Sequence, residues 1–152
     1  MRIVIQRVKE ASVSLDGSVS ASIGAGFLIL CGIAKDDTEK EINDMAVKVS
    51  KFRIIEDSQG KMNVDIRSAG QEVLSVSQFT LVSTVTEGNR PGFSSAASGE
   101  KAENMWRAFN QRLREQGLKV KEGVFGAEME VRLVNDGPVT FVLDFVNEGG
   151  DR

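Results

Sequence analysis

The chain reads ASVSLDGSVSASIGAGFLILCGIA over residues 11–34, and this stretch largely decides the fold. Apolar residues alternate with polar ones on both sides of Asp16-Gly17, over 11–15 and 19–23. Asp-Gly suits the positive φ angles of a tight primed turn, so the alternation predicts a β-hairpin. Residues 27–34 are apolar on both faces, which predicts a central strand that is covered on both sides.

Two segments outside this stretch have the periodicity of amphipathic helices. Thr38 followed by Glu41 is a capping-box pattern, and apolar residues recur behind it at positions 42, 45, 46 and 49. A second apolar stripe lies within residues 102–113, with Ser98 as its N-cap and Gly117 as its stop. We interpret both stripes as faces that dock on a sheet and not as cofactor motifs.

Three further segments are typical of strands, namely residues 72–81, 129–134 and 139–146. The last two flank Asn135-Asp136-Gly137-Pro138, whose turn-forming residues predict a tight reversal. Strands in runs, with two helices grouped apart from them, predict an α+β fold. We expect an antiparallel or mixed sheet curled into a barrel-like core with two main helices. The 152 residues fit a single domain.

The composition excludes several classes of chemistry. The chain has no histidine, which excludes Ser-His, Cys-His and His-ligated metal mechanisms. Its single cysteine, Cys31, stands in an apolar run and is interpreted as an inert core thiol. No ligand spacing indicates a metal, and we expect no cofactor. Any catalysis would have to use carboxylates, amines, hydroxyls, amides or the backbone.

The charge and hydropathy indicate a cytoplasmic protein. No apolar run approaches the roughly 18 residues that span a bilayer, and the N-terminus lacks a secretory signal. The net charge of −3 argues against a broad, sequence-independent grip on nucleic acid. A local positive strip nevertheless lies between residues 101 and 121: Lys101, Arg107, Arg112, Arg114, Lys119 and Lys121. Either a solvated helix face or contact with a phosphate backbone explains this strip.

Two segments carry polar groups suited to acyl chemistry. In Ser77-Gln78-Phe79-Thr80 the strand period places Ser77 and Phe79 on one side, and Gln78 and Thr80 on the other. Backbone N–H groups there, or the Gln78 amide, would stabilise a carbonyl oxygen that becomes negative. A half-exposed strand is the alternative. The patch from Phe125 to Met129 would wall a small pocket or simply pack the core.

Two loops are the other candidates. At Gly137 another backbone or a ligand can approach closely, and Pro138 is a candidate for a cis bond, although an ordinary hairpin turn also explains the pair. Residues 86–97 are small and polar and too many for a mere turn. Arg90 is the strong phosphate or carboxylate ligand of that loop, which is otherwise explained as a mobile solvated segment.

Taken together, these motifs resemble the D-aminoacyl-tRNA deacylase family. The resemblance rests on Ser77-Gln78-Phe79-Thr80-Leu81 and on Asn135-Asp136-Gly137-Pro138-Val139-Thr140, with Gly88-Asn89-Arg90-Pro91 between them. It extends from Met1 to Phe145, and Gly92 departs from the serine more common in the family. The resemblance implies a deacylase domain over residues 1–146, followed by a short C-terminal tail at 147–152.

The resemblance also implies a function in translation quality control. The chain would hydrolyse the ester between a D-amino acid, or glycine, and the 3′ end of tRNA, as a homodimer of barrel-like subunits. Gly137 and a cis Pro138 would enter the partner's active site and exclude L side chains by close backbone contact. Ser77 to Thr80 would line that site, with Phe125 and Met129 in the substrate-binding region. Arg90, Lys101 and Arg107 would contact the tRNA.

Two questions about catalysis stay open at the level of the sequence. Either backbone N–H groups near Gln78 and Phe79 act together with the ribose 2′-hydroxyl, or Thr80 acts as a covalent nucleophile, although no histidine is present to activate it. The function also has alternatives: a non-catalytic module that binds RNA or a small ligand, or a hydrolase of other esters or amides of D-amino acids. An activity assay separates these functions.

Overall fold

The computed structural model describes residues 1–146, so the expected tail at 147–152 lies outside the described residues. The elements follow in the order β1 (Arg2–Leu15), β2 (Ser18–Ile23), β3 (Gly26–Gly32), α1 (Glu39–Lys51), β4 (Ile55–Glu56), β5 (Met62–Val64), α2 (Ile66–Ala69), β6 (Glu72–Ser77), the 3₁₀ turn η1 (Phe79–Leu81), α3 (Gly99–Glu115), β7 (Lys119–Glu122) and β8 (Glu130–Asp144). This confirms the expected α+β class.

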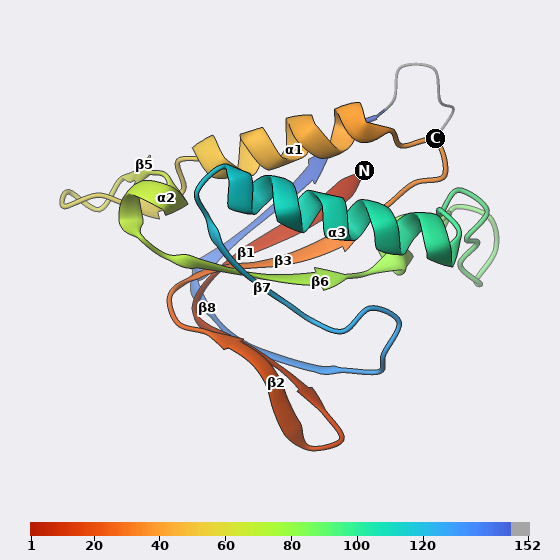
Figure 1. Ribbon diagram of the computed structural model, residues 1–152, viewed down its shortest axis with the longest axis horizontal. Helices are drawn as coiled ribbons and strands as arrows, with labels where there is room; N and C mark the ends of the chain where they lie inside the picture. The colour runs from red at the N-terminus through yellow and green to blue at the C-terminus, as the bar shows by residue number, and fades with distance from the viewer. Residues whose placement is uncertain (147–152) are drawn as a thin grey trace.

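Strand β1 organises the main sheet because it pairs with three others. Its first half pairs antiparallel with β3 and its second half with β2, while β8 pairs with it along nearly its whole length. Beyond β3 follow β6 and β7, each parallel to its neighbour. The sheet is therefore mixed. It curls into an almost closed barrel, in which β2 and part of β8 lie on the side away from the helices α1 and α3 (Figure 1).

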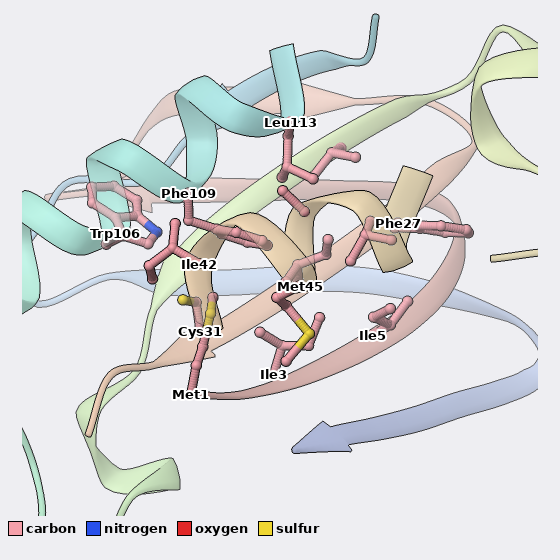
Figure 2. Close-up of a cluster of buried hydrophobic side chains, with 14 of the residues drawn as sticks. Met1, Ile3, Ile5, Phe27, Cys31, Ile42, Met45, Trp106, Phe109 and Leu113 are labelled. Carbon is pink, nitrogen blue, oxygen red and sulfur yellow. The ribbon is translucent and has the colours of Figure 1, made fainter. Parts of the chain in front are cut away.

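The helices α1 and α3 cover one face of this sheet side by side (Figure 1). The main core lies between them and the strands: Ile3 and Ile5 of β1 meet Met45 of α1 and Phe109 of α3 (Figure 2). A second, smaller apolar cluster, which includes Val13, fills the opposite face inside the curl of β1, β2 and β8. The two stripes identified in the sequence are thus core faces, as predicted.

Most local predictions are confirmed. Asp16 and Gly17 both have positive φ, 49° and 81°, in the turn between β1 and β2. Strand β3 is buried along almost all of its length. The capping box of α1 is present, with the Glu41 carboxylate accepting from the Thr38 N–H at 2.6 Å.

Two predictions about strands are wrong. The predicted strand over 72–81 ends at Ser77, and a 3₁₀ turn follows. This turn packs directly on Gly32 of β3, where a Cβ would lie 2.9 Å from Leu81 Cβ, so the chain leaves the sheet by crossing over the end of β3. The tight reversal at 135–138 does not exist either.

Instead, one continuous strand, β8, replaces the two predicted over 129–134 and 139–146. Its pairing with β1 passes from Val8–Asn135 to Gln6–Thr140, so residues 136–139 bulge out of the ladder. The Asn135 side chain closes the bulge, because its Oδ1 accepts from Val139 N at 2.7 Å. Turn-forming residues therefore make a bulge here, and β8 continues along the same edge of β1.

Candidate active site

A cavity of about 500 Å³ opens at the carboxyl ends of the parallel strands β6 and β7. Its walls come from three segments, residues 76–79 after β6, residues 97–102 at the start of α3, and residues 125–131 leading into β8. This volume is typical of sites for small molecules. The cavity brings together five of the predicted site residues: Ser77, Gln78, Phe79, Phe125 and Met129.

No ionisable side chain lines this cavity within the described residues 1–146. Its polar groups are the Ser77 hydroxyl, the Gln78 amide and backbone atoms. Burial raises the pKa of the Cys31 thiol, which lies behind the wall and stays protonated. Among residues 1–146, no cluster of three or more carboxylate or thiol side chains is arranged to hold a metal ion. The site's chemistry must therefore come from neutral groups, from the substrate, or from another chain.

The turn after β6 presents two backbone donors. Gln78 N–H still belongs to the sheet, donating to Cys31 O at 2.8 Å. The next two N–H groups, of Phe79 and Thr80, have no acceptor among residues 1–146, because a 3₁₀ turn leaves its first donors free. The sequence predicted that backbone N–H groups near Gln78 and Phe79 hold the ester carbonyl. The N–H groups that are free to do so are those of Phe79 and Thr80, whereas that of Gln78 is already bonded.

Thr80 itself is exposed and does not line the cavity. Its hydroxyl oxygen accepts a hydrogen bond from Gln78 Nε2 at 2.5 Å. The alternation of side chains in a strand had predicted that Gln78 and Thr80 lie on the same side, and the structure adds that the two side chains are in contact. No carboxylate or amine of residues 1–146 contacts the Thr80 hydroxyl. The arrangement fixes the hydroxyl but supplies no base to activate it.

Helix α3 and the core hold the opposite wall in place. The Trp106 indole packs against the Phe125 ring at a centroid distance of 5.9 Å, and its N–H donates to the buried Ser75 hydroxyl at 2.9 Å. Ser75 O accepts from Gly123 N at 2.9 Å, which ties the segment after β7 to β6. Met129 Sδ accepts from Val124 N at 3.4 Å. Both cavity walls therefore rest on the same buried contacts.

Gly137 and Pro138 are not part of this cavity. They lie on the surface in the β8 bulge, joined by a cis peptide bond, six residues beyond Val131 of the cavity wall. At about 3.3 Å per residue, that separation is about 20 Å along the strand. One chain alone does not bring the two motifs together.

The buried side chain of Arg7 supports the bulge from the core side. The sequence had not singled out this residue. Its buried guanidinium donates to Asp136 O at 3.0 Å and to Ile54 O at 2.7 Å, and lies 3.4 Å from a Glu56 carboxylate oxygen. The available signal was its register: Ile3, Ile5 and Arg7 share the buried face of β1. A charged residue in an apolar alternation indicates a specific partner.

The predicted tRNA contacts are scattered, and much of the positive strip is neutralised. Arg107 pairs with Glu103 at 2.9 Å, and Lys101 donates to a backbone carbonyl. Further ion pairs in the strip are Arg112–Glu115, Arg114–Glu122 and Lys121–Glu72, and within residues 1–146 only Lys119 of the strip has no such partner. Arg90 is exposed on the loop before α3 and has no polar partner among residues 1–146.

No helix within residues 1–146 has the length and apolar character needed to cross a membrane.

The matching family model and the curated relatives name the same kind of activity. The family described as D-Tyr-tRNA(Tyr) deacylase matches residues 4–144. A D-aminoacyl-tRNA deacylase from Brevibacillus brevis is 49% identical over 95% of this chain and 99% of its own length. One from Thermus aquaticus is 48% identical over the full length of both chains. A solved structure titled c-Myc DNA Unwinding Element Binding Protein is 40% identical, with a TM-score of 0.91 over 97% of this chain and 100% of its own.

Proposed function

Because this chain belongs to the D-Tyr-tRNA(Tyr) deacylase family, we propose that it hydrolyses the ester that joins a D-amino acid to the 3′ end of tRNA. It is a hydrolase of the aminoacyl-tRNA ester, with a role in translation proofreading. The finer proposal concerns how a cavity without ionisable groups performs this reaction and how it rejects L-amino acids. One observation on residues 1–146 carries it: Phe79, whose N–H is free, lines a cavity without ionisable side chains, and the free N–H of Thr80 follows it in the same turn.

Ester hydrolysis suits such a cavity because the carbonyl needs polarisation more than a protein nucleophile. Water adds to the ester carbonyl, and the oxygen that becomes negative accepts hydrogen bonds from the N–H groups of Phe79 and Thr80. The bond from the acyl carbon to the ribose oxygen then breaks, and that oxygen takes a proton. The products are the free amino acid and tRNA. The ribose 2′-hydroxyl helps to position and activate the water, because no side chain of residues 1–146 that lines the cavity can act as a base.

The chiral filter acts between two copies of the chain. Gly137 and Pro138 lie about 20 Å along β8 from the chain's own cavity, so their backbone can meet a substrate only in a second copy. Their exposure and their position outside the β1–β8 ladder support this, because the carbonyl groups of a bulge are available to another molecule. Close approach of backbone atoms excludes the Cβ of an L-amino acid. Glycine has no Cβ and is accepted as a substrate.

The first experiment compares hydrolysis of D-tyrosyl-tRNA and L-tyrosyl-tRNA at catalytic amounts of protein. We expect rapid loss of the D ester only. Loss of both esters would remove the filter from the proposal while leaving the esterase. Binding of tRNA with loss of neither ester would mean a binding module. Sedimentation of the same sample tests the dimer, and a monomer that discriminates between the esters would contradict a filter acting between copies.

Replacing Thr80 with Ala and with Ser tests its rival role as a nucleophile. Thr80→Ala keeps the backbone N–H, so we expect it to retain most of the hydrolysis rate. A covalent mechanism predicts near-complete loss in Thr80→Ala and substantial activity in Thr80→Ser, which keeps a hydroxyl. That pattern would overturn the backbone mechanism.

A further inference from the structure

We propose that the ring pair Phe79–Phe93 is a stacking platform for the unpaired nucleotide that precedes the esterified adenosine of the tRNA. The proposal rests on the proposed function and extends it from the ester to the strand that carries it. It concerns the mouth of the cavity and the rings of the two residues, whereas only the backbone N–H of Phe79 acts on the ester.

The two rings form an exposed aromatic surface. Their centroids are 5.1 Å apart with planes tilted by 59°. After this contact, Phe79 is still 55% exposed and Phe93 39% exposed. Contact between two phenyl rings usually removes most of their apolar surface from water. A pair that stays this exposed has ring surface left for a third flat group.

The platform is held in place from both sides of Phe93. Thr84 and Gly92 exchange two backbone hydrogen bonds, of 2.8 and 2.9 Å, which close the loop before it. After it, Ser95 O accepts from Lys35 N at 2.9 Å, and Ala97 N donates to Ile33 O at 3.0 Å. The loop lies beside the first turn of α3 (Figure 1). Its aromatic ring is therefore presented from an anchored backbone.

The place of the platform points to a nucleotide. Phe79 lines the cavity, and the exposed Phe93 contacts the Phe79 ring without lining the cavity itself. If the ester occupies the cavity, the nucleotide bonded to the esterified adenosine has to leave through this mouth. Bases of single strands stack on exposed aromatic side chains, so the exposed faces of these rings can accept the base of that nucleotide.

The charges around the rings suit a phosphate backbone. Arg90 is exposed in the same loop and has no polar partner among residues 1–146. Lys101 donates to the backbone carbonyl of Lys35, whose N–H donates to Ser95 O, so the Lys101 ammonium lies at the base of the loop. The carboxylates nearest in sequence to these groups are those of Asp36, Asp37, Glu87 and Glu100, of which Asp37 pairs with the Met1 amino group. Cations near exposed aromatic rings are the usual components of a single-strand site, and Arg90 and Lys101 supply them here.

The experiment compares two esters of the same amino acid. One is the D-tyrosyl ester of adenosine, which fills only the cavity. The other is the D-tyrosyl ester of the trinucleotide cytidyl-cytidyl-adenosine, which also reaches the mouth. The measured quantity is the ratio of kcat/KM for the trinucleotide ester to kcat/KM for the adenosine ester.

We expect Phe93→Ala to lower this ratio about tenfold, the size expected for the loss of one stacked base. Phe93→Trp should restore it, because the aromatic face returns, whereas Phe93→Leu should not, although it keeps an apolar side chain. Val85→Ala is the matched control: Val85 is an apolar residue of the same loop, 69% exposed, and its loss should not move the ratio.

An equal fall for both esters in Phe93→Ala, or recovery by Phe93→Leu, would overturn the stacking role. A change in sedimentation with an unchanged ratio would assign the rings to contact with a second copy of the chain. Binding of the unesterified trinucleotide, measured by calorimetry, separates this proposal from the proposed function. If the unmodified protein hydrolyses neither ester, the deacylase proposal fails, and weaker trinucleotide binding by Phe93→Ala still supports the platform. Equal binding refutes it.

Discussion

Replacing Gly137 with alanine tests the proposed filter at its centre. Gly137 has a φ of 149°, a conformation that L side chains rarely adopt. A Cβ at this position would lie 2.6 Å from Val139 Cγ2 and 2.8 Å from Val139 N. Valine is stiff about χ1, and Asn135 Oδ1 holds Val139 N at 2.7 Å. Neither the Val139 side chain nor the Val139 backbone nitrogen can shift at low energetic cost, so an added Cβ has to displace the backbone of the bulge.

The expected effects follow from that movement. A strained φ costs on the order of 1–3 kcal/mol. At about 2–4 °C per kcal/mol for a chain of this size, a cost of about 2 kcal/mol lowers Tm by about 4–8 °C. A misplacement of about 1 Å changes rates by up to about 100-fold. We therefore expect the ratio of D- to L-tyrosyl-tRNA hydrolysis to fall by about 10- to 100-fold, mainly because hydrolysis of the L ester rises.

The assay follows release of labelled tyrosine from both esters, beside a thermal melt of each variant. Gly17→Ala is the matched control, because Gly17 also has a positive φ, 81°, but no atom lies within 4 Å of its built Cβ. This variant should lower Tm while keeping the D/L ratio. If Gly137→Ala lowered Tm and kept the original D/L ratio, the filter would have to be assigned to other residues.

Three further predictions concern the groups that support the site. Arg7→Met removes the guanidinium that donates to Asp136 O; leaving buried carbonyls unsatisfied should cost about 2–4 kcal/mol in urea unfolding and lower the D/L ratio, and an unchanged midpoint would contradict this role. Burial raises the pKa of Glu41, but hydrogen bonds from Thr38 more than offset this, so the pKa lies below its ordinary value. Glu41 therefore stabilises the fold above its unfolded pKa of about 4.3 and loses this contribution as the pH falls through the folded pKa; Glu41→Gln should flatten the acid limb of the stability curve, and superimposable curves would refute it. Burial raises the pKa of the Cys31 thiol, so a maleimide should label it only after unfolding, and rapid labelling of active protein would show that the core opens.

The sequence predicts those parts of the fold that local interactions decide. The turn at Asp16-Gly17 and the capping box between Thr38 and Glu41 depend on residues at most three apart, and both are present. The buried strand at 27–34 is also correct, with slightly different ends. The motif Ser77 to Thr80 and the pair Phe125 and Met129 were suspected from residue types, and all of these six residues except Thr80 border the cavity.

The failures have non-local causes. The residues at 135–138 suit a hairpin turn and a bulge equally well. A bulge forms because β8 pairs with β1 on both sides of Arg7 and so continues along the same edge of the sheet. The positive strip looked free because the acidic partners come from other elements: Glu122 of β7 meets Arg114 of α3, and Glu72 of β6 meets Lys121 of β7. Periodicity alone cannot report such contacts.

The proposed site depends on backbone atoms, and this ties its chemistry to the stability of the fold. A catalytic side chain can be moved by changing its rotamer, but the N–H groups of Phe79 and Thr80 move only if the turn after β6 moves. That turn is fixed by the bond from Gln78 N to Cys31 O and by its packing on Gly32. The bulge that carries the proposed filter is likewise fixed by a buried guanidinium beneath it. Both parts therefore obtain their precision from the core, and a neutral cavity can discriminate between mirror-image substrates only as well as that core holds its backbone.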